Sequence, residues 1–185
     1  RRVYFAVVCE VSGFLWVLPL SGKDEMADQI RNLMNQIKRR FPKSIRLADG
    51  ETKPLEKLCW FFKCDQEPNN KSPQVVRALQ SFDVENIYSP PYVPELNGNI
   101  ERALQTFGLA HTAVMCGVDE GLHCFGAEQT NFALNHTPRR RYARLDSSYD
   151  GKSPIEVLEM FYGPDSVKMY KVKVEDFRRF GSLVW

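Results

Sequence analysis

Two apolar runs separated by a short turn open the chain. Residues 3–9 and 14–20 are rich in β-branched and aromatic side chains, a composition typical of buried strands. Val11-Ser12-Gly13 lies between them and favours a turn. The pattern therefore predicts a β-hairpin at the start of the chain.

Apolar side chains recur at helical spacing in much of the remaining sequence. Residues 23–40 carry one apolar stripe with charged residues opposite, and Pro42 follows as a helix terminator. The same reasoning predicts a short strand at 44–48, an apolar helical piece at 54–64, a helix at 75–82, a strand at 84–89, and helices at 96–116 and 121–135. This mixture of elements predicts an α/β fold.

Composition adds broad limits to this pattern. A chain of 185 residues with 43% hydrophobic and 26% charged residues suits one globular domain. A net charge of +2 does not by itself demand a nucleic-acid partner. The five cysteines form no zinc-type pairs, which favours reduced thiols in an intracellular protein, with nucleus and organelle both left open. No apolar run reaches the roughly 20 residues of a membrane helix.

Residues 88–102 are the most informative stretch. Prolines 90, 91 and 94 hold the chain extended, Asn97-Gly98 gives a hinge, and Glu101 falls in the first turns of the next helix. An acid there suits the positive end of the helix dipole. The stretch resembles the third acidic motif of retroviral and copia-type retrotransposon integrases, Pro-Tyr-x-Pro-Gln-x-Asn-Gly-x-x-Glu-Arg, with Glu95 near the usual glutamine.

Four further segments resemble the same family in the same order, at residues 4–25, 125–138, 152–163 and 179–181. The resemblance covers nearly the whole chain. It implies an RNase H-like fold, in which a mixed five-stranded sheet has helices on both faces. We expect a single integrase-core-like domain over 1–185, with an insertion at about 51–74 and a C-terminal extension at about 152–185.

The resemblance also implies an acidic site. The family holds two divalent cations with three carboxylates, and its second aspartate and its glutamate lie about 35 residues apart. The first aspartate belongs to a strand that would precede residue 1. Aligned on Ile45-Arg46 and Gly50, the second aspartate's position is Ala48, which 52 residues separate from Glu101.

Alanine offers no ligand, so this alignment predicts a vestigial Glu101 and no bound metal or other cofactor. Asp49 is one residue later, where a strand side chain points to the opposite face. Only a register shift at a bulge would bring Asp49 into the site, and Mg²⁺ would then be the expected cofactor.

The absent first strand has a second consequence. In the family it lies in the centre of the sheet, so its loss would leave two rows of backbone groups unpaired. We expect a strand to fill this gap, either from upstream chain or from another protein subunit.

Basic residues supply candidate nucleic-acid contacts. They form one run after the predicted helix at 121–135 and another at the end of the first helix: Arg139, Arg140, Arg141, Arg144, Lys38, Arg39 and Arg40. The alternatives are a solvated loop or a contact with an acidic protein. The three histidines show no metal-ligand spacing and are expected to be surface or hydrogen-bonded residues.

Three functions stay open from the sequence. The first is a catalytically inactive, domesticated integrase-like domain that serves as a structural or binding module in a nucleoprotein or organellar assembly. The second is a fragment of an active copia-type integrase that performs metal-dependent DNA strand transfer. The third is a nucleic-acid-binding protein without chemistry.

Overall fold

A computed structural model describes residues 3–40, 44–46, 52–54, 61–90, 98–140, 145 and 147–163. Its centre is an antiparallel hairpin of β1 (Val3–Val8) and β2 (Leu15–Leu20), as the two apolar runs predict. At the turn, the Cys9 amide donates to the Phe14 carbonyl over 2.8 Å, and Gly13 adopts a φ of +67°. A positive φ at this position favours glycine because it lacks a Cβ.

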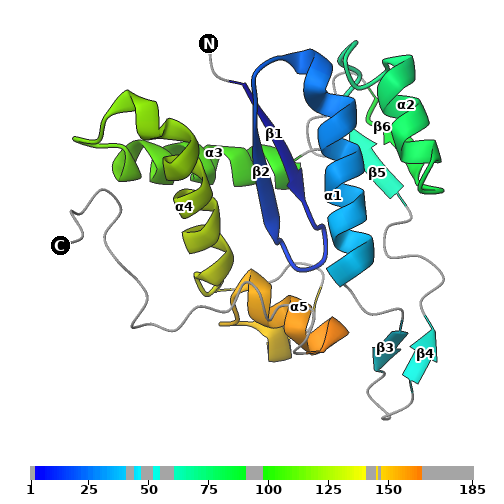
Figure 1. Cartoon of the computed structure of the whole chain (residues 1–185). Helices are drawn as coiled ribbons and strands as arrows, with labels where there is room; N and C mark the ends of the chain where they lie inside the picture. Colours follow the sequence, from blue (N-terminus) through cyan, green and yellow to red (C-terminus); the bar gives the residue numbers. More distant parts are fainter. Residues whose placement is uncertain are drawn as a thin grey trace.

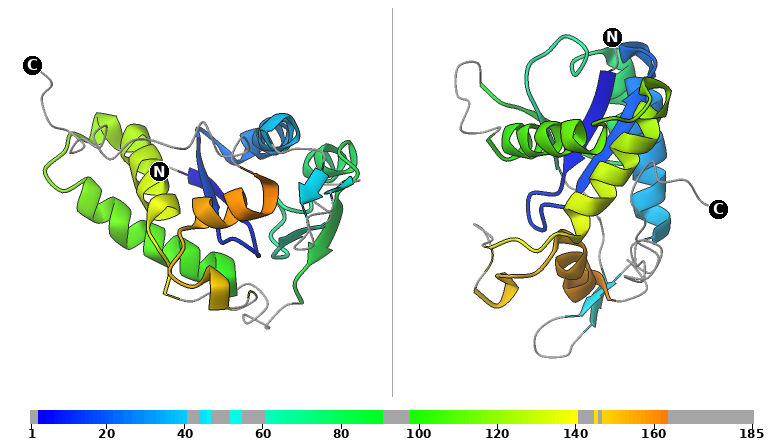
Figure 2. Two further views of the ribbon diagram at one scale, coloured as in Figure 1. Left: turned by 90° about the horizontal axis from the view of Figure 1, so that it is seen from below. Right: turned by 90° about the vertical axis from the view of Figure 1, so that its left-hand side faces the viewer.

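Helices cover both faces of the hairpin (Figures 1 and 2). One face packs against α1 (Met26–Arg40), which follows a short 3-10 turn, η1 (Lys23–Glu25), and against α2 (Pro73–Gln80). The buried residues of this core include Phe5, Leu20, Ile30, Leu33, Leu79 and Val84. The periodic stripe of the sequence is thus the buried face of α1.

The opposite face of the hairpin packs against α3 (Gly98–Val114) and α4 (His123–His136), which the 3-10 turn η3 (Glu120–Leu122) precedes. Leu15 and Val17 of β2 meet Phe107 of α3 and Ala127 of α4 in a second buried cluster. The helices predicted at 96–116 and 121–135 are therefore confirmed.

A hydrogen-bonded histidine pair lies beside this second cluster. The His111 imidazole is 7% exposed and lies 3.2 Å from Nε2 of His123, while its Nδ1 is 3.3 Å from the Thr130 hydroxyl. The Tyr4 hydroxyl also bonds to His123. The hydrogen-bonded role expected for these two histidines agrees with this arrangement.

A second pair of strands, β5 (Phe61–Cys64) and β6 (Glu85–Tyr88), is parallel and is joined through α2. The prediction of a helical piece reaching residue 64 is wrong, because residues 61–64 pair with β6 along their whole length. β5 lies inside the range expected to be an insertion and forms a βαβ unit with α2 and β6, and the insertion itself stays a prediction.

The hairpin and the parallel pair face each other across what we call the seam, the boundary between β1 and β5. The Phe5 and Phe62 rings stack across it with centroids 6.3 Å apart, and Lys63 Nζ lies 3.8 Å from the Glu10 carboxylate. Within the described residues, β1 pairs with β2 alone and β5 with β6 alone. The edges of β1 and β5 that face the seam thus have no strand partner in the described part of the chain.

The remaining elements lie at one end of the molecule (Figure 1). β3 (Ser44–Arg46) and β4 (Thr52–Pro54) form a short antiparallel pair, so β3 does not pair with β1. After the 3-10 turn η4 (Ser147–Tyr149), α5 (Pro154–Tyr162) buries Ile155 and Leu158 against Phe14 of the hairpin. None of the helices in the described ranges is long and apolar enough to cross a membrane.

Candidate active site

Glu101 lies in the first turn of α3, where an acid complements the helix dipole. Its side chain is exposed, although α3 itself packs on β1. The residues 91–97 that lead into this helix lie outside the described part of the chain. Ala48 and Asp49 lie outside it too, so the register shift proposed for Asp49 stays a prediction.

A different acid, Asp65, directly follows β5. Because β5 and β6 are parallel, their carboxyl ends meet at the same edge of the sheet. The Ser89 amide donates to the Cys64 carbonyl over 2.9 Å, and the Gln66 side chain donates to the Ser89 carbonyl over 3.1 Å. Asp65 therefore stands beside the point where the chain leaves β6 towards Glu101.

Local hydrogen bonds orient the Asp65 carboxylate. Its Oδ1 accepts from the Glu67 amide over 3.1 Å and from the Asn70 side chain over 2.6 Å. The residue is exposed, and these two bonds use only one of its oxygens. Neither bond uses Oδ2, which can therefore accept from water or bind a ligand.

The sequence analysis missed Asp65, although a signal for it was present. Exactly 35 residues separate Asp65 from Glu101, the interval that the resemblance leads one to expect between the second and third acids. The alignment at Ala48 rested instead on three nearby residues around the turn at 49–50. Asp65 is followed by Gln66-Glu67 rather than by the asparagine and glycine of the family pattern, which hid the match.

Two carboxylates suit a hard cation such as Mg²⁺, which prefers oxygen ligands. The carboxylates of Asp65 and Glu101 are of the ligand type that such a cation prefers. The described residues contain no group of three or more metal-ligating side chains, so these two acids would need a further ligand.

Burial shapes the chemistry of the neighbouring thiol. Burial and then the adjacent Asp65 carboxylate raise the pKa of Cys64 from 9.0 to about 11, with Lys71 acting in the opposite direction. The thiol donates to Asn86 over 3.3 Å. Cys64 is consequently a neutral donor at the edge of the site and not a nucleophile.

The predicted basic residues come from two separate elements. Lys38 and Arg39 are exposed on the last turn of α1, which also contains Arg40. Arg139 and Arg140 follow α4, whereas Arg141 and Arg144 lie outside the described residues. Arg140 is exposed, but Arg139 is half-buried and reaches back to the hairpin.

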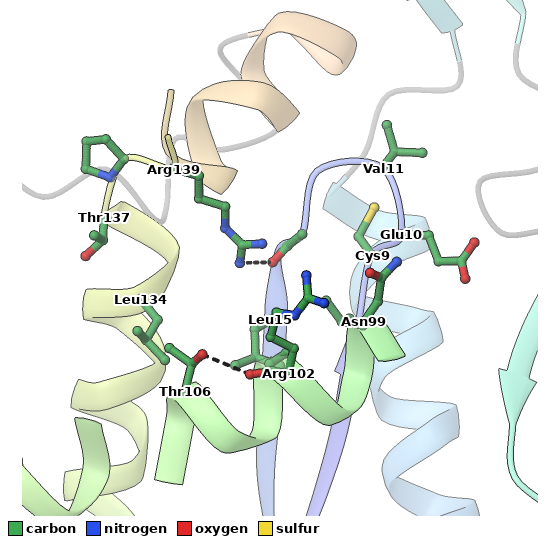
Figure 3. Close-up of a pocket in the computed structure, with 14 residues that line it drawn as sticks. Cys9, Glu10, Val11, Leu15, Asn99, Arg102, Thr106, Leu134, Thr137 and Arg139 are labelled. Carbon is green, nitrogen blue, oxygen red and sulfur yellow. Dashed lines mark hydrogen bonds between the residues drawn. The ribbon is translucent and has the colours of Figure 1, made fainter. Parts of the chain in front are cut away.

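Arg139 borders a cavity of about 360 Å³ between the hairpin turn, the first turns of α3 and the end of α4 (Figure 3). Arg102, the neighbour of Glu101, lines the same cavity. The sequence analysis did not single out Arg102 as a site residue, because nothing local shows that residues 102 and 139 meet.

The comparisons with known proteins support the fold. No protein-family model matches this chain, and neither does any curated protein. Among solved structures, the chain is similar to the catalytic core domain of BIV integrase, with a TM-score of 0.56 and 14% identity over 92% of this chain and 91% of that one. The chain thus has an integrase-core, RNase H-like fold; the copia-type relationship stays a prediction.

Proposed function

We propose that this chain is an integrase-type core in which Asp65 and Glu101 are two of the carboxylate ligands for Mg²⁺-dependent chemistry on DNA phosphodiesters. The observation that carries the proposal is the position of Asp65. Asp65 directly follows β5, which runs parallel to β6, and 35 residues separate it from Glu101, the interval that the resemblance implies between the second and third acids. The similarity of fold to an integrase core agrees with this function.

An inactive domain was expected in part because Ala48 stands at the second acid position and in part because the first acid would precede residue 1. With Asp65 in that role, only the first acid of the expected three has no counterpart in this sequence. When bound, divalent cations activate an attacking oxygen and stabilise the leaving one. The contribution of Asp65 and Glu101 would be to hold such cations on a rigid strand end and a helix start.

Cation binding by the purified chain tests the proposal. We expect Mn²⁺ titration by calorimetry to show binding that Asp65→Asn and Glu101→Gln each weaken at least tenfold, because each removes one anionic ligand. Asp49→Asn is the matched control and should bind as the unchanged chain does. Loss of binding in Asp49→Asn alone would instead support the register-shifted site, and no effect of Asp65→Asn would reject ours.

One observation favours a second candidate, the non-catalytic structural or binding module. The 2.6 Å bond from Asn70 and the bond from the Glu67 amide make Asp65 an organiser of the 65–70 turn. If this were its sole role, Asp65→Asn would lower stability but leave cation binding and Mg²⁺-dependent DNA joining unchanged. Unfolding and titration of the same variant separate the two functions.

The unpartnered edges of β1 and β5 support a partner proposal as well. We propose that a further strand, from upstream chain or from another subunit, pairs along the seam, as the family fold implies. Amides of β1 that point into the seam should then exchange quickly in this chain alone. They should become protected when upstream chain or a donor subunit supplies the strand.

A further inference from the structure

The cavity of about 360 Å³ beside α3 is lined by both apolar and basic side chains. Val8, Leu15, Ala103 and Leu134 are among the apolar lining residues, and Arg102, Arg139 and Asn99 are among the polar ones. The volume falls within the range of small-ligand pockets. The lining residues of α3 are spaced three and four apart, so they share one helix face, which is turned away from Glu101.

Arg139 is fixed in place by three hydrogen bonds. Its amide donates to the Lys152 carbonyl over 2.9 Å, and its carbonyl accepts from the Gly151 amide over 2.8 Å. Its Nη2 donates to the Gly13 carbonyl over 2.8 Å. A Cβ at Gly13 would overlap this guanidinium, so the glycine allows the close approach. The bond to Gly13 uses one of the five guanidinium N–H donors, so four are left for a ligand.

The charges around the cavity do not cancel. Arg102 and Arg139 are the cationic lining residues, and Glu10 is the one acidic residue that the described lining contains. Glu10 already faces Lys63 across the seam at 3.8 Å. Figure 3 shows the Arg102 and Arg139 side chains directed towards the same space from α3 and from the segment after α4. Two guanidinium groups at one cavity repel each other unless an anion lies between them.

We propose that this cavity binds a phosphate group between Arg102 and Arg139, and that the group belongs to the backbone of bound DNA. Guanidinium groups match phosphate oxygens in planar, often bidentate geometry. The Asn99 amide at the start of α3 can add a third donor. The lining residues of the cavity support the anion site, whereas its assignment to DNA rests on the proposed function.

DNA binding in the absence of divalent cations tests the site separately from the acids. A fluorescent duplex oligonucleotide is titrated with the chain in EDTA at several salt concentrations, and anisotropy is measured. We expect Arg102→Gln and Arg139→Gln each to weaken binding about tenfold and to reduce the salt slope by about 1. Arg77→Gln, at an exposed position on α2, is the matched control and should change neither quantity.

The double variant adds a sharper criterion. If both guanidinium groups hold one phosphate, Arg102→Gln/Arg139→Gln should bind little worse than either single variant, because contacts to a shared group are not additive. Unchanged affinity and salt slope in Arg102→Gln would overturn the proposal. Arg102 is exposed, so this variant is expected to fold even if Arg139→Gln does not.

Inorganic phosphate distinguishes the two sources of the anion. Phosphate that competes with the oligonucleotide in the unchanged chain but not in Arg102→Gln supports the site. If Arg102→Gln instead abolished phosphate binding and left DNA binding unchanged, that result would overturn the assignment to DNA and make free phosphate the ligand. Unchanged cation binding in Asp65→Asn and Glu101→Gln would reject the proposed function, whereas unchanged DNA binding in Arg102→Gln in EDTA would reject this site, so the two failures give different results.

Discussion

Replacing Asn135 by alanine removes both ends of a hydrogen-bonded link between α4 and β2. The Asn135 side chain is 3% exposed; its Oδ1 accepts from the Leu15 amide over 2.8 Å, and its Nδ2 donates to the Leu15 carbonyl over 2.7 Å. The Cys9 amide bonds to Phe14, so the backbone groups of Leu15, the next residue, point away from β1. In the described part of the chain, no strand pairs along that side of β2 to replace Asn135.

The expected loss follows from those two buried groups. An unsatisfied buried donor or acceptor costs about 1–3 kcal/mol, so we expect Asn135→Ala to lower the free energy of unfolding by about 2–4 kcal/mol. That is a large fraction of the roughly 5–15 kcal/mol that stabilises a typical domain. Urea denaturation followed by circular dichroism measures the change, provided that the slope with urea stays constant.

Two companion variants make the result interpretable. Glu128→Ala changes an exposed residue of the same helix and should cost less than about 0.5 kcal/mol. Asn135→Asp keeps an acceptor for the Leu15 amide but turns a carboxylate oxygen towards the Leu15 carbonyl, so it should be destabilised near neutral pH. If Asn135→Ala were no less stable than Glu128→Ala, the reasoning that this residue holds the edge of β2 would be refuted.

Two further predictions concern the thiol beside the site and the start of α5. Because burial raises the pKa of Cys64 from 9.0 to about 11, its alkylation by iodoacetamide should rise only towards pH 11. At pH 8 Cys64 should be labelled more slowly than the exposed thiol of Cys116, and equal labelling rates would contradict this. The part of the stability that depends on the neutral Cys64 thiol should be lost as the pH rises from 9.0 to about 11, and Cys64→Ser should remove this loss. Ser153 caps α5, because its hydroxyl accepts from the Glu156 amide over 3.4 Å and its backbone amide donates to the Glu156 carboxylate over 2.7 Å. Ser153→Ala should therefore cost about 1 kcal/mol in urea denaturation and Ser153→Thr, which keeps the hydroxyl, much less, whereas equal stability of the two variants would argue against the cap.

Strong local periodicity explains what could be predicted from the sequence. The hairpin and the helices α1, α3 and α4 have apolar patterns long enough to reveal which face is buried. β5 has only four residues, and apolar neighbours on its N-terminal side imitate a helical pattern. Its strand conformation depends on pairing with β6, some twenty residues later, which no local window can show.

Some residues of the candidate site could likewise be predicted from the sequence, and others could not. Glu101 could be predicted because its prolines, hinge and helix start are adjacent in sequence. Asp65 could have been found only by combining the interval to Glu101 with the parallel pairing of β5. Arg102 and Arg139 line one cavity because α3 and the end of α4 both lie beside the hairpin turn, although the two residues are far apart in the sequence.

The seam between the hairpin and the parallel pair gives the proposed acids a thermodynamic connection. Asp65 follows β5 on one side, and Glu101 belongs to α3, which packs on β1 on the other. A cation held by both would act as a cross-link between two halves of the domain, and its binding energy would appear as resistance to unfolding. If a strand bound in the seam raises the affinity for the cation, then the bound cation must raise the affinity for that strand by the same factor. Completion of the sheet by the strand and binding of the cation would then be thermodynamically coupled.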